Sequence, residues 1–354
     1  MAFNFPGFGG FQQPQRRPPQ PRQRQPLNPK QKKQLRTVGI VVAVLIGIFV
    51  IVPPLVSVYT GWLWFDSLAK GGVFGTILGT RLGLFLIFGA LSAVILYLCM
   101  ELAHRTKPTT PARPNPVLDS YRRMGSGKHK PVFSVIAAVL GIFFGFSAQM
   151  KWQQVSVFFN AQSFGVNDPQ FGRDLGFYAF QLPFLNILVT WLVSLVAIGV
   201  ILNIFLHYFQ GSLELRPRQG KQRGSVVLAQ KARQQIAILG GILILLVGVR
   251  YWLDRYELLS GDINFKDQTI TGAGFTSANV LMSAKLLLTV IAVFCAVAFF
   301  TSFVIRDLRI PALATAIMLI GGVAVGSILP WAVEQLSVKP LSLIHISEPT
   351  RRYA

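Results

Sequence analysis

The feature that most constrains this chain is a series of seven long apolar runs separated by shorter polar segments. A helix that crosses a bilayer needs about 20 mostly apolar residues, because only backbone hydrogen bonds within the segment are available in hydrocarbon. The runs cover residues 38–59, 82–100, 132–148, 184–208, 236–252, 286–305 and 310–333. They predict an all-α fold: a polytopic membrane protein with seven transmembrane helices.

The composition agrees with a membrane protein and excludes a soluble domain. Hydrophobic residues make up 52% of the chain and charged residues only 13%, with a mean hydropathy of +0.51. Soluble domains carry about 25% charged residues. The net charge of +21 is typical of nucleic-acid binding, but the basic residues are dispersed between the apolar runs. We therefore expect no nucleic-acid partner.

Basic residues alternate between the loops, and this alternation predicts the orientation. Eight Lys or Arg residues precede the first run, and the second and fourth loops carry seven and six. The first and third loops carry only two each, and the fifth loop, 254–284, also carries two. Loops rich in Lys and Arg remain in the cytoplasm. The N-terminus is therefore predicted to be cytoplasmic and the C-terminus extracytoplasmic.

Residues 1–37 are predicted to form a disordered, basic cytoplasmic tail that precedes the transmembrane domain at 38–340. A segment so rich in Pro, Gln and Arg does not bury enough apolar surface to fold alone. Basic side chains near a membrane surface are attracted to anionic lipid by about 1 kcal/mol each. The expected partners are therefore the lipid bilayer and anionic lipid at this tail. The alternative is a docking tail for an acidic or proline-binding partner.

No motif predicts catalysis, a cofactor or a metal site. Cys99 and Cys295 lie inside apolar runs, where a thiol behaves as a small apolar group, and the four histidines are scattered along the sequence. The glycine-containing segment at 125–129 lacks the first glycine and the final hydroxyl of a phosphate-binding loop. We expect no catalytic residue, no cofactor, no metal ligand and no enzymatic activity.

The third and fifth loops supply candidate residues for loop ordering or binding. Aromatic residues at near-helical spacing in the third loop, 149–183, predict a short helix lying in the outer interface. Clustered surface charges are more often structural than functional. We therefore expect the third-loop charges to pair with each other and with the backbone, and a ligand or metal site is the alternative. The candidates are Asp168, Arg173, Asp174, Arg255 and Glu257.

Glycines four residues apart predict close helix packing, because two backbones can approach without side chains between them. The predicted packing positions are Gly79, Gly83, Gly141, Gly145, Gly322 and Gly326. Packing within the bundle is the favoured interpretation, and formation of a homo-oligomer is the alternative. Pro53 and Pro54 lie inside the first run and are expected to kink it.

Charged residues lie near the ends of the apolar runs, which disfavours a proton or ion pathway. Arg250 is followed one turn later by Asp254, so an ion pair within one helix is expected. A transporter would instead bring polar side chains of several helices together at bilayer depth. The residues that would converge in that case are Ser92, Thr190, Ser194, Asn203 and Thr315.

Four motifs carry a family resemblance. The longest is Asp168-Pro169-x-Phe171-Gly172-x-Asp174-x-Gly176-Phe177-Tyr178-x-Phe180-x-Leu182-Pro183, and the others are Trp62-x-Trp64-Phe65, Arg255-Tyr256-x-Leu258-Leu259 and Gly272-Ala273-x-x-Thr276. Over about residues 38–340 the chain resembles a bacterial group known as Uncharacterised Protein Family 0182. The resemblance implies seven N-terminal spans in the bacterial plasma (inner) membrane, a large extracytoplasmic domain after them, and no established activity. Around Thr276, where an aromatic residue and an acid are expected, this chain has Phe275 and Ser277.

The last residues, 341–354, begin Leu341-Ser342-Leu343-Ile344-His345 and resemble the translation of a transposase-type sequencing adapter. We expect this segment to be non-native and the chain to be a truncated fragment. The alternative is a natural extracytoplasmic tail.

The favoured hypothesis is a non-enzymatic envelope protein whose helix bundle anchors a large extracytoplasmic domain. An envelope protein or a second copy of the chain is the candidate partner. The alternative is a transporter or channel for an envelope component, and an intramembrane lipid-modifying enzyme has the least support because no catalytic set is present.

The predicted orientation is testable with reporter fusions. Fusions after Ser126 and Gly220 should report the cytoplasm, because both lie in loops rich in Lys and Arg. Fusions after Asn167 and Asp267 should report the outside. An outside signal from the Gly220 fusion would contradict the arrangement of seven spans.

Overall fold

The computed structural model describes residues 29–106, 129–216, 225–265, 268–305, 309–333 and 335–336, and the chain divides after Phe74 into two units. Within the described residues, seven helices are long and apolar enough to cross a membrane. They cover Thr37–Ser67, Gly71–Arg105, His129–Gln149, Phe177–Phe209, Gln230–Ser260, Ser277–Phe303 and Pro311–Val333. The predicted all-α fold with seven such helices is confirmed, and the orientation of its ends stays a prediction.

The first unit is dominated by one long helix, α1 (Pro29–Ser67), which runs through Pro53 and Pro54 without interruption. Residues 29–37 of the predicted tail are therefore helical, since their Lys, Gln, Arg and Leu residues are good helix formers. The rest of that tail, 1–28, and the predicted non-native segment 341–354 lie outside the described residues. A tight turn with Ala69 at a φ of 53° ends the helix.

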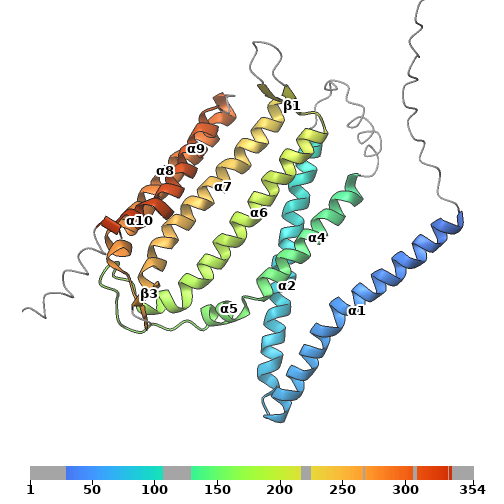
Figure 1. Ribbon diagram of the computed structural model, residues 1–354, viewed down its shortest axis with the longest axis horizontal. Coiled ribbons are helices and arrows are strands. Elements are labelled where there is room, and N and C mark those ends of the chain that lie inside the picture. Colours follow the sequence, from blue (N-terminus) through green and yellow to red (C-terminus); the bar gives the residue numbers. More distant parts are fainter. Residues whose placement is uncertain are drawn as a thin grey trace, which may run out of the picture. The chain divides into compact units, whose positions relative to one another are not determined.

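The second unit is a bundle of long helices in which neighbours in the chain are neighbours in space. Figure 1 shows α6, α7 and α8 side by side in chain order, with α9 against α8. The helices are α2 (Gly71–Arg105, which begins in the first unit), α4 (His129–Gln149), α6 (Leu182–Phe209), α7 (Gln230–Glu257), α8 (Met282–Ile305) and α9 (Arg309–Val323).

Buried side chains form separate clusters along the bundle. Ile244, Ala292 and Met318 join α7, α8 and α9, while Met100 and Phe133 join α2 and α4. Many other large apolar side chains point outward, which is expected of helices that face hydrocarbon rather than water.

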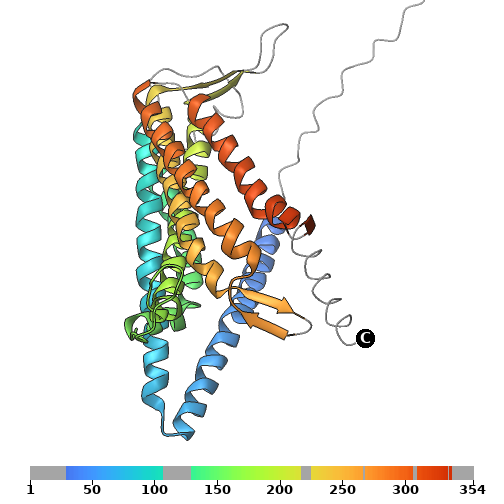
Figure 2. The same cartoon turned by 90° about the vertical axis from the view of Figure 1, so that its left-hand side faces the viewer.

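Short elements lie at the two ends of the bundle. The hairpin of β1 (Leu213–Arg216) and β2 (Ser225–Leu228) lies at one end, and the hairpin of β3 (Asp262–Phe265) and β4 (Gln268–Thr271) at the other (Figure 2). Sequence analysis missed both hairpins, because four-residue strands are too short to show a clear period of two.

The end that carries β3 and β4 also holds several irregular helical segments. A π-helical turn precedes both α6 and α8, and a single 3₁₀ turn follows α7. The segments are α5 (Trp152–Phe159), η1 (Phe177–Gln181), η2 (Leu258–Ser260) and η3 (Ser277–Leu281); η4 (Ala324–Ile328) and α10 (Leu329–Val333) continue α9.

The helix predicted in the third loop is α5. Its Val155 side chain is buried, and the ring of Phe158 stacks on that of Phe184 with centroids 4.1 Å apart. Phe159 is 76% exposed. Val155 and Phe158 therefore pack inward, and the position of α5 relative to a membrane stays a prediction.

The predicted glycine positions differ in their surroundings. Gly141 and Gly145 lie in α4 against α2, where a Cβ at Gly145 would come 2.6 Å from the carbonyl oxygen of Phe85. A Cβ at Gly322 would lie 3.0 Å from the Tyr251 hydroxyl oxygen. At the remaining predicted positions, a Cβ would meet no atom of the chain within 4 Å; these are Gly79, Gly83 and Gly326.

The close approach of α2 and α4 predicts a stability effect. A Cβ at Gly141 would lie 2.7 Å from both the Cβ of Ala93 and the carbonyl oxygen of Gly89. Gly141→Ala should therefore destabilise the bundle by about 1–3 kcal/mol, since backbone atoms cannot move aside cheaply. Gly79→Ala is the matched control and should be neutral or slightly stabilising. Thermal unfolding in detergent measures both, and equal midpoints would contradict the proposed contact.

Candidate functional site

The third loop is ordered around the carboxylate of Asp168, which is 7% exposed. The backbone N–H groups of Gln170 and Phe171 donate to its two oxygens at 3.0 and 2.7 Å, and the Tyr178 hydroxyl donates at 3.0 Å. The N–H of Asp168 donates to the carbonyl oxygen of Arg173 at 2.8 Å. The loop itself thus occupies both oxygens of this carboxylate.

Asp174 orders the preceding part of the same loop. Its carboxylate accepts hydrogen bonds from the Ser163 hydroxyl at 2.5 Å and from the N–H groups of Phe164, Gly165 and Gly176 at 3.0, 2.9 and 2.6 Å. These donors, the Ser163 hydroxyl first, lower the pKa of Asp174 to about 2, because they favour the ionised form.

The third predicted residue of this loop, Arg173, is placed differently. It is exposed, and its guanidinium lies 5.6 Å from the centroid of the Phe177 ring. No ion pair joins it to Asp168 or Asp174 in the described part of the chain. The carboxylates therefore bind backbone and hydroxyl groups, as expected, but the expected pairing of the charges with one another is not found. Backbone N–H groups of the compact turns bind these carboxylates in place of the Arg173 guanidinium.

Aromatic rings hold the third loop against the end of α7. The buried ring of Tyr256 lies 4.7 Å from that of Phe171, 5.4 Å from that of Phe177 and 5.1 Å from that of Trp252, centroid to centroid. Arg255, a predicted candidate, places its guanidinium 5.3 Å from the Phe171 centroid, within cation–π distance. We call Phe171, Phe177, Tyr178, Trp252 and Tyr256 the aromatic cluster.

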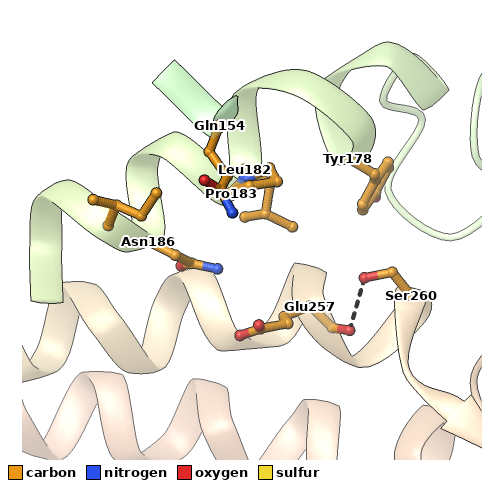
Figure 3. Close-up of a pocket in the computed structure, with 8 residues that line it drawn as sticks. Gln154, Tyr178, Leu182, Pro183, Asn186, Glu257 and Ser260 are labelled. Atoms are coloured by element: carbon orange, nitrogen blue, oxygen red, sulfur yellow. Dashed lines mark hydrogen bonds between the residues drawn. The ribbon is translucent and has the colours of Figure 1, made fainter. Parts of the chain in front are cut away.

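The last predicted candidate, Glu257, lines a pocket of about 230 Å³ beside the aromatic cluster. Figure 3 shows Gln154 from α5 and Asn186 from α6 pointing into the same space, with Glu257 and Ser260 on the facing segment. The structure thus separates the candidates: Asp168 and Asp174 are bound by their own loop, whereas Glu257 lines a space.

Arg250, Asp254 and Lys285 form a charged cluster near the same end of the bundle. Arg250 and Asp254 of α7 form the expected ion pair at 3.9 Å, and Lys285 of α8 approaches the other oxygen of Asp254 at 2.7 Å. Arg250 also donates to the hydroxyl of Thr190 on α6. Sequence analysis missed the role of Lys285, because a partner 31 residues away in sequence leaves no periodic signal.

The opposite end brings together histidines that are far apart in sequence. The rings of His104 and His129 stack with centroids 4.0 Å apart, and the Nε2 atom of His129 lies 3.8 Å from Glu101. His207 contacts Gln235 at 3.2 Å. The predicted orientation of the spans puts all these residues on one side of the membrane. This shared side is the signal by which the sequence could have located the group. Over the described residues, no set of three or more His, Cys, Asp or Glu side chains is arranged to hold a metal ion.

Four of the five residues that a transporter would bring together make separate contacts in the described chain. The indole N–H of Trp191 donates to Ser92 at 3.1 Å, whereas Thr190 lies beside Arg250. Two others bond to carbonyl oxygens one turn earlier in their own helices, and these are Asn203 and Thr315.

Comparisons with known proteins place the chain in a family. The sequence model of an uncharacterised protein family, UPF0182, matches residues 38–345. The chain belongs to this family. Its relatives include UPF0182 proteins of Rhodococcus erythropolis (40% identical over 85% of this chain), Mycolicibacterium vanbaalenii (42% over 85%) and Mycobacterium marinum (40% over 86%). The chain spans only 30%, 29% and 30% of those proteins. No solved structure matches it.

The lowered pKa of Asp174 predicts acid-induced opening of the third loop. A depressed pKa means that the stabilisation is present above the ordinary value of about 3.9 and is lost as pH falls towards 2. Pepsin should therefore cleave next to Phe164 faster at pH 2 than at pH 4. The cleavage rate is divided by that of an isolated peptide with the sequence of the third loop, which removes the pH dependence of pepsin itself. Asp174→Asn should be cleaved fast at both pH values, and Arg173→Gln should behave as the unchanged chain. Slow cleavage of Asp174→Asn at pH 4 would contradict this role.

Proposed function

We propose that this chain is the membrane anchor of a longer, non-enzymatic envelope protein in the bacterial plasma membrane. In this proposal, the helix bundle holds an extracytoplasmic region that lies outside the present chain. The small share of each relative that the chain covers supports this view, together with the seven helices able to span a membrane.

The observation that carries the proposal is the ordered surface at the end of the bundle that bears β3 and β4. Two carboxylates bind the third loop internally, and the aromatic cluster fastens it to α7. The loop is thus organised before any partner arrives, which lowers the entropic cost of association.

This ordered surface exposes apolar side chains suited to contact with a further region. Phe164 and Val166 of the third loop are 53% and 57% exposed, and Phe275, just before η3, is 62% exposed. Exposed apolar groups beside polar ones are typical of protein interfaces. We propose that these three residues contact the extracytoplasmic region, and that the basic N-terminal tail contacts anionic lipid on the other side.

A transporter or channel for an envelope component is the second candidate. The contact of Lys285 on α8 with Asp254 on α7 favours it, because ionisable residues that pair between spans often mark a substrate pathway. The separate contacts of Ser92, Asn203 and Thr315 disfavour it. Structural ion pairing is a sufficient explanation of Arg250, Asp254 and Lys285.

Cross-linking tests the anchor proposal in a full-length relative, such as that of Rhodococcus erythropolis. A photo-reactive amino acid is placed at the positions aligned with Val166 and Phe275. It should cross-link to the part of the same protein that lies outside the region aligned with this chain, as detected by peptide mass spectrometry.

The matched control carries the same amino acid at the position of Phe143, which is 78% exposed on the side of α4. This site should label lipid and no part of the extracytoplasmic region. Labelling of the extracytoplasmic region from Phe143, or its absence from both loop positions, would overturn the proposed surface.

A further inference from the structure

The pocket beside the aromatic cluster lies where the spans end. Its walls come from α5, from η1 and the first turns of α6, and from the last turn of α7 with η2 (Figure 3). The candidate spans that contain α6 and α7 run over Phe177–Phe209 and Gln230–Ser260, so their ends coincide with this space. In a membrane, such a place is at the level of the lipid headgroups.

The polar side chains around the pocket fall into two groups. Tyr178 and Ser260 are already bonded, to the Asp168 carboxylate at 3.0 Å and to the carbonyl oxygen of Glu257 at 3.1 Å. Gln154, Asn186 and Glu257 have no side-chain hydrogen bond within the described residues. The Oε1 atom of Gln154 is shielded from solvent and still lacks a donor.

These unpaired groups define the chemistry of the missing partner. A carboxylate only accepts hydrogen bonds, and the amide oxygens of Gln154 and Asn186 add further acceptors. Among the described residues that line the pocket, Glu257 alone has an ordinarily charged side chain. The guanidinium of the neighbouring Arg255 is engaged with the Phe171 ring. The partner should therefore be a cation with several N–H donors, which describes a primary ammonium group.

The remaining wall is apolar and indicates that the ammonium belongs to a lipid. Leu182, Pro183 and Ile187 line the same pocket. We propose that this pocket binds the headgroup of a phospholipid with a primary ammonium, of the phosphatidylethanolamine type, with Glu257 as the residue that recognises the charge. The acyl chains lie along the apolar face of α6, and the lipid fills the space between α5 and the two helices.

The test measures lipid binding to the detergent-purified chain by native mass spectrometry. Phosphatidylethanolamine is compared with its N-acetylated form, which keeps the phosphate and the chains but loses the ammonium. The ammonium lipid should bind about tenfold more tightly, as expected of a charge-assisted hydrogen bond. Glu257→Gln should abolish this preference without weakening the binding of the acetylated lipid. Equal binding of the two lipids to the unchanged chain would overturn the proposal.

Two controls separate the proposed site from general effects. Asp66→Asn removes another exposed acid that does not line the pocket, and it should leave the preference intact. Because Glu257 is exposed, its substitution should leave the thermal unfolding midpoint unchanged.

Soluble phosphoethanolamine is added as a competitor. If it displaces the lipid at equal concentration, the apolar wall contributes nothing and the lipid assignment is wrong; if the lipid remains bound, the assignment stands.

Discussion

The structure depends on one constraint, which is that an apolar helix in hydrocarbon must satisfy its backbone hydrogen bonds within itself. Each long helix does so over its length and leaves its side chains to contact either another helix or the surroundings. Close helix contacts occur where side chains are small, as at Gly141 and Gly145 on α4. Elsewhere the outward surface is largely apolar, with side chains such as Phe143 and Phe294 at 78% and 71% exposure.

The same constraint places the polar chemistry at the ends of the helices. At one end, Asp168 and Asp174 accept hydrogen bonds from backbone N–H groups of their own loop, and these bonds make the third loop compact. The ring of Tyr256 then connects that loop to α7. The result is a preformed surface, which agrees better with an anchor that presents another region than with a moving gate.

The lipid pocket and the ordered surface are built from some of the same elements. They differ in whether their polar side chains have hydrogen-bond partners within the chain. The loop carboxylates are bonded, whereas Glu257, Gln154 and Asn186 line a space without internal partners in the described chain. A headgroup bound there would connect α5 to α6 and α7. Lipid binding would thus stabilise the surface that we assign to the anchor function, although the pocket and the anchor do not require each other.

The sequence by itself determined the number of spans, their approximate bounds, the helix at α5 and the family, because apolar runs, aromatic spacing and the Asp168–Pro183 motif are local signals. It also selected Asp168, Asp174 and Glu257 as candidates, but it could not separate them. Only the tertiary structure showed which carboxylates are bound by their own loop and which one lines a space. The pairing of Lys285 with Asp254 and the stacking of His104 on His129 were likewise decided there, since such contacts join distant segments and depend on how helices pack.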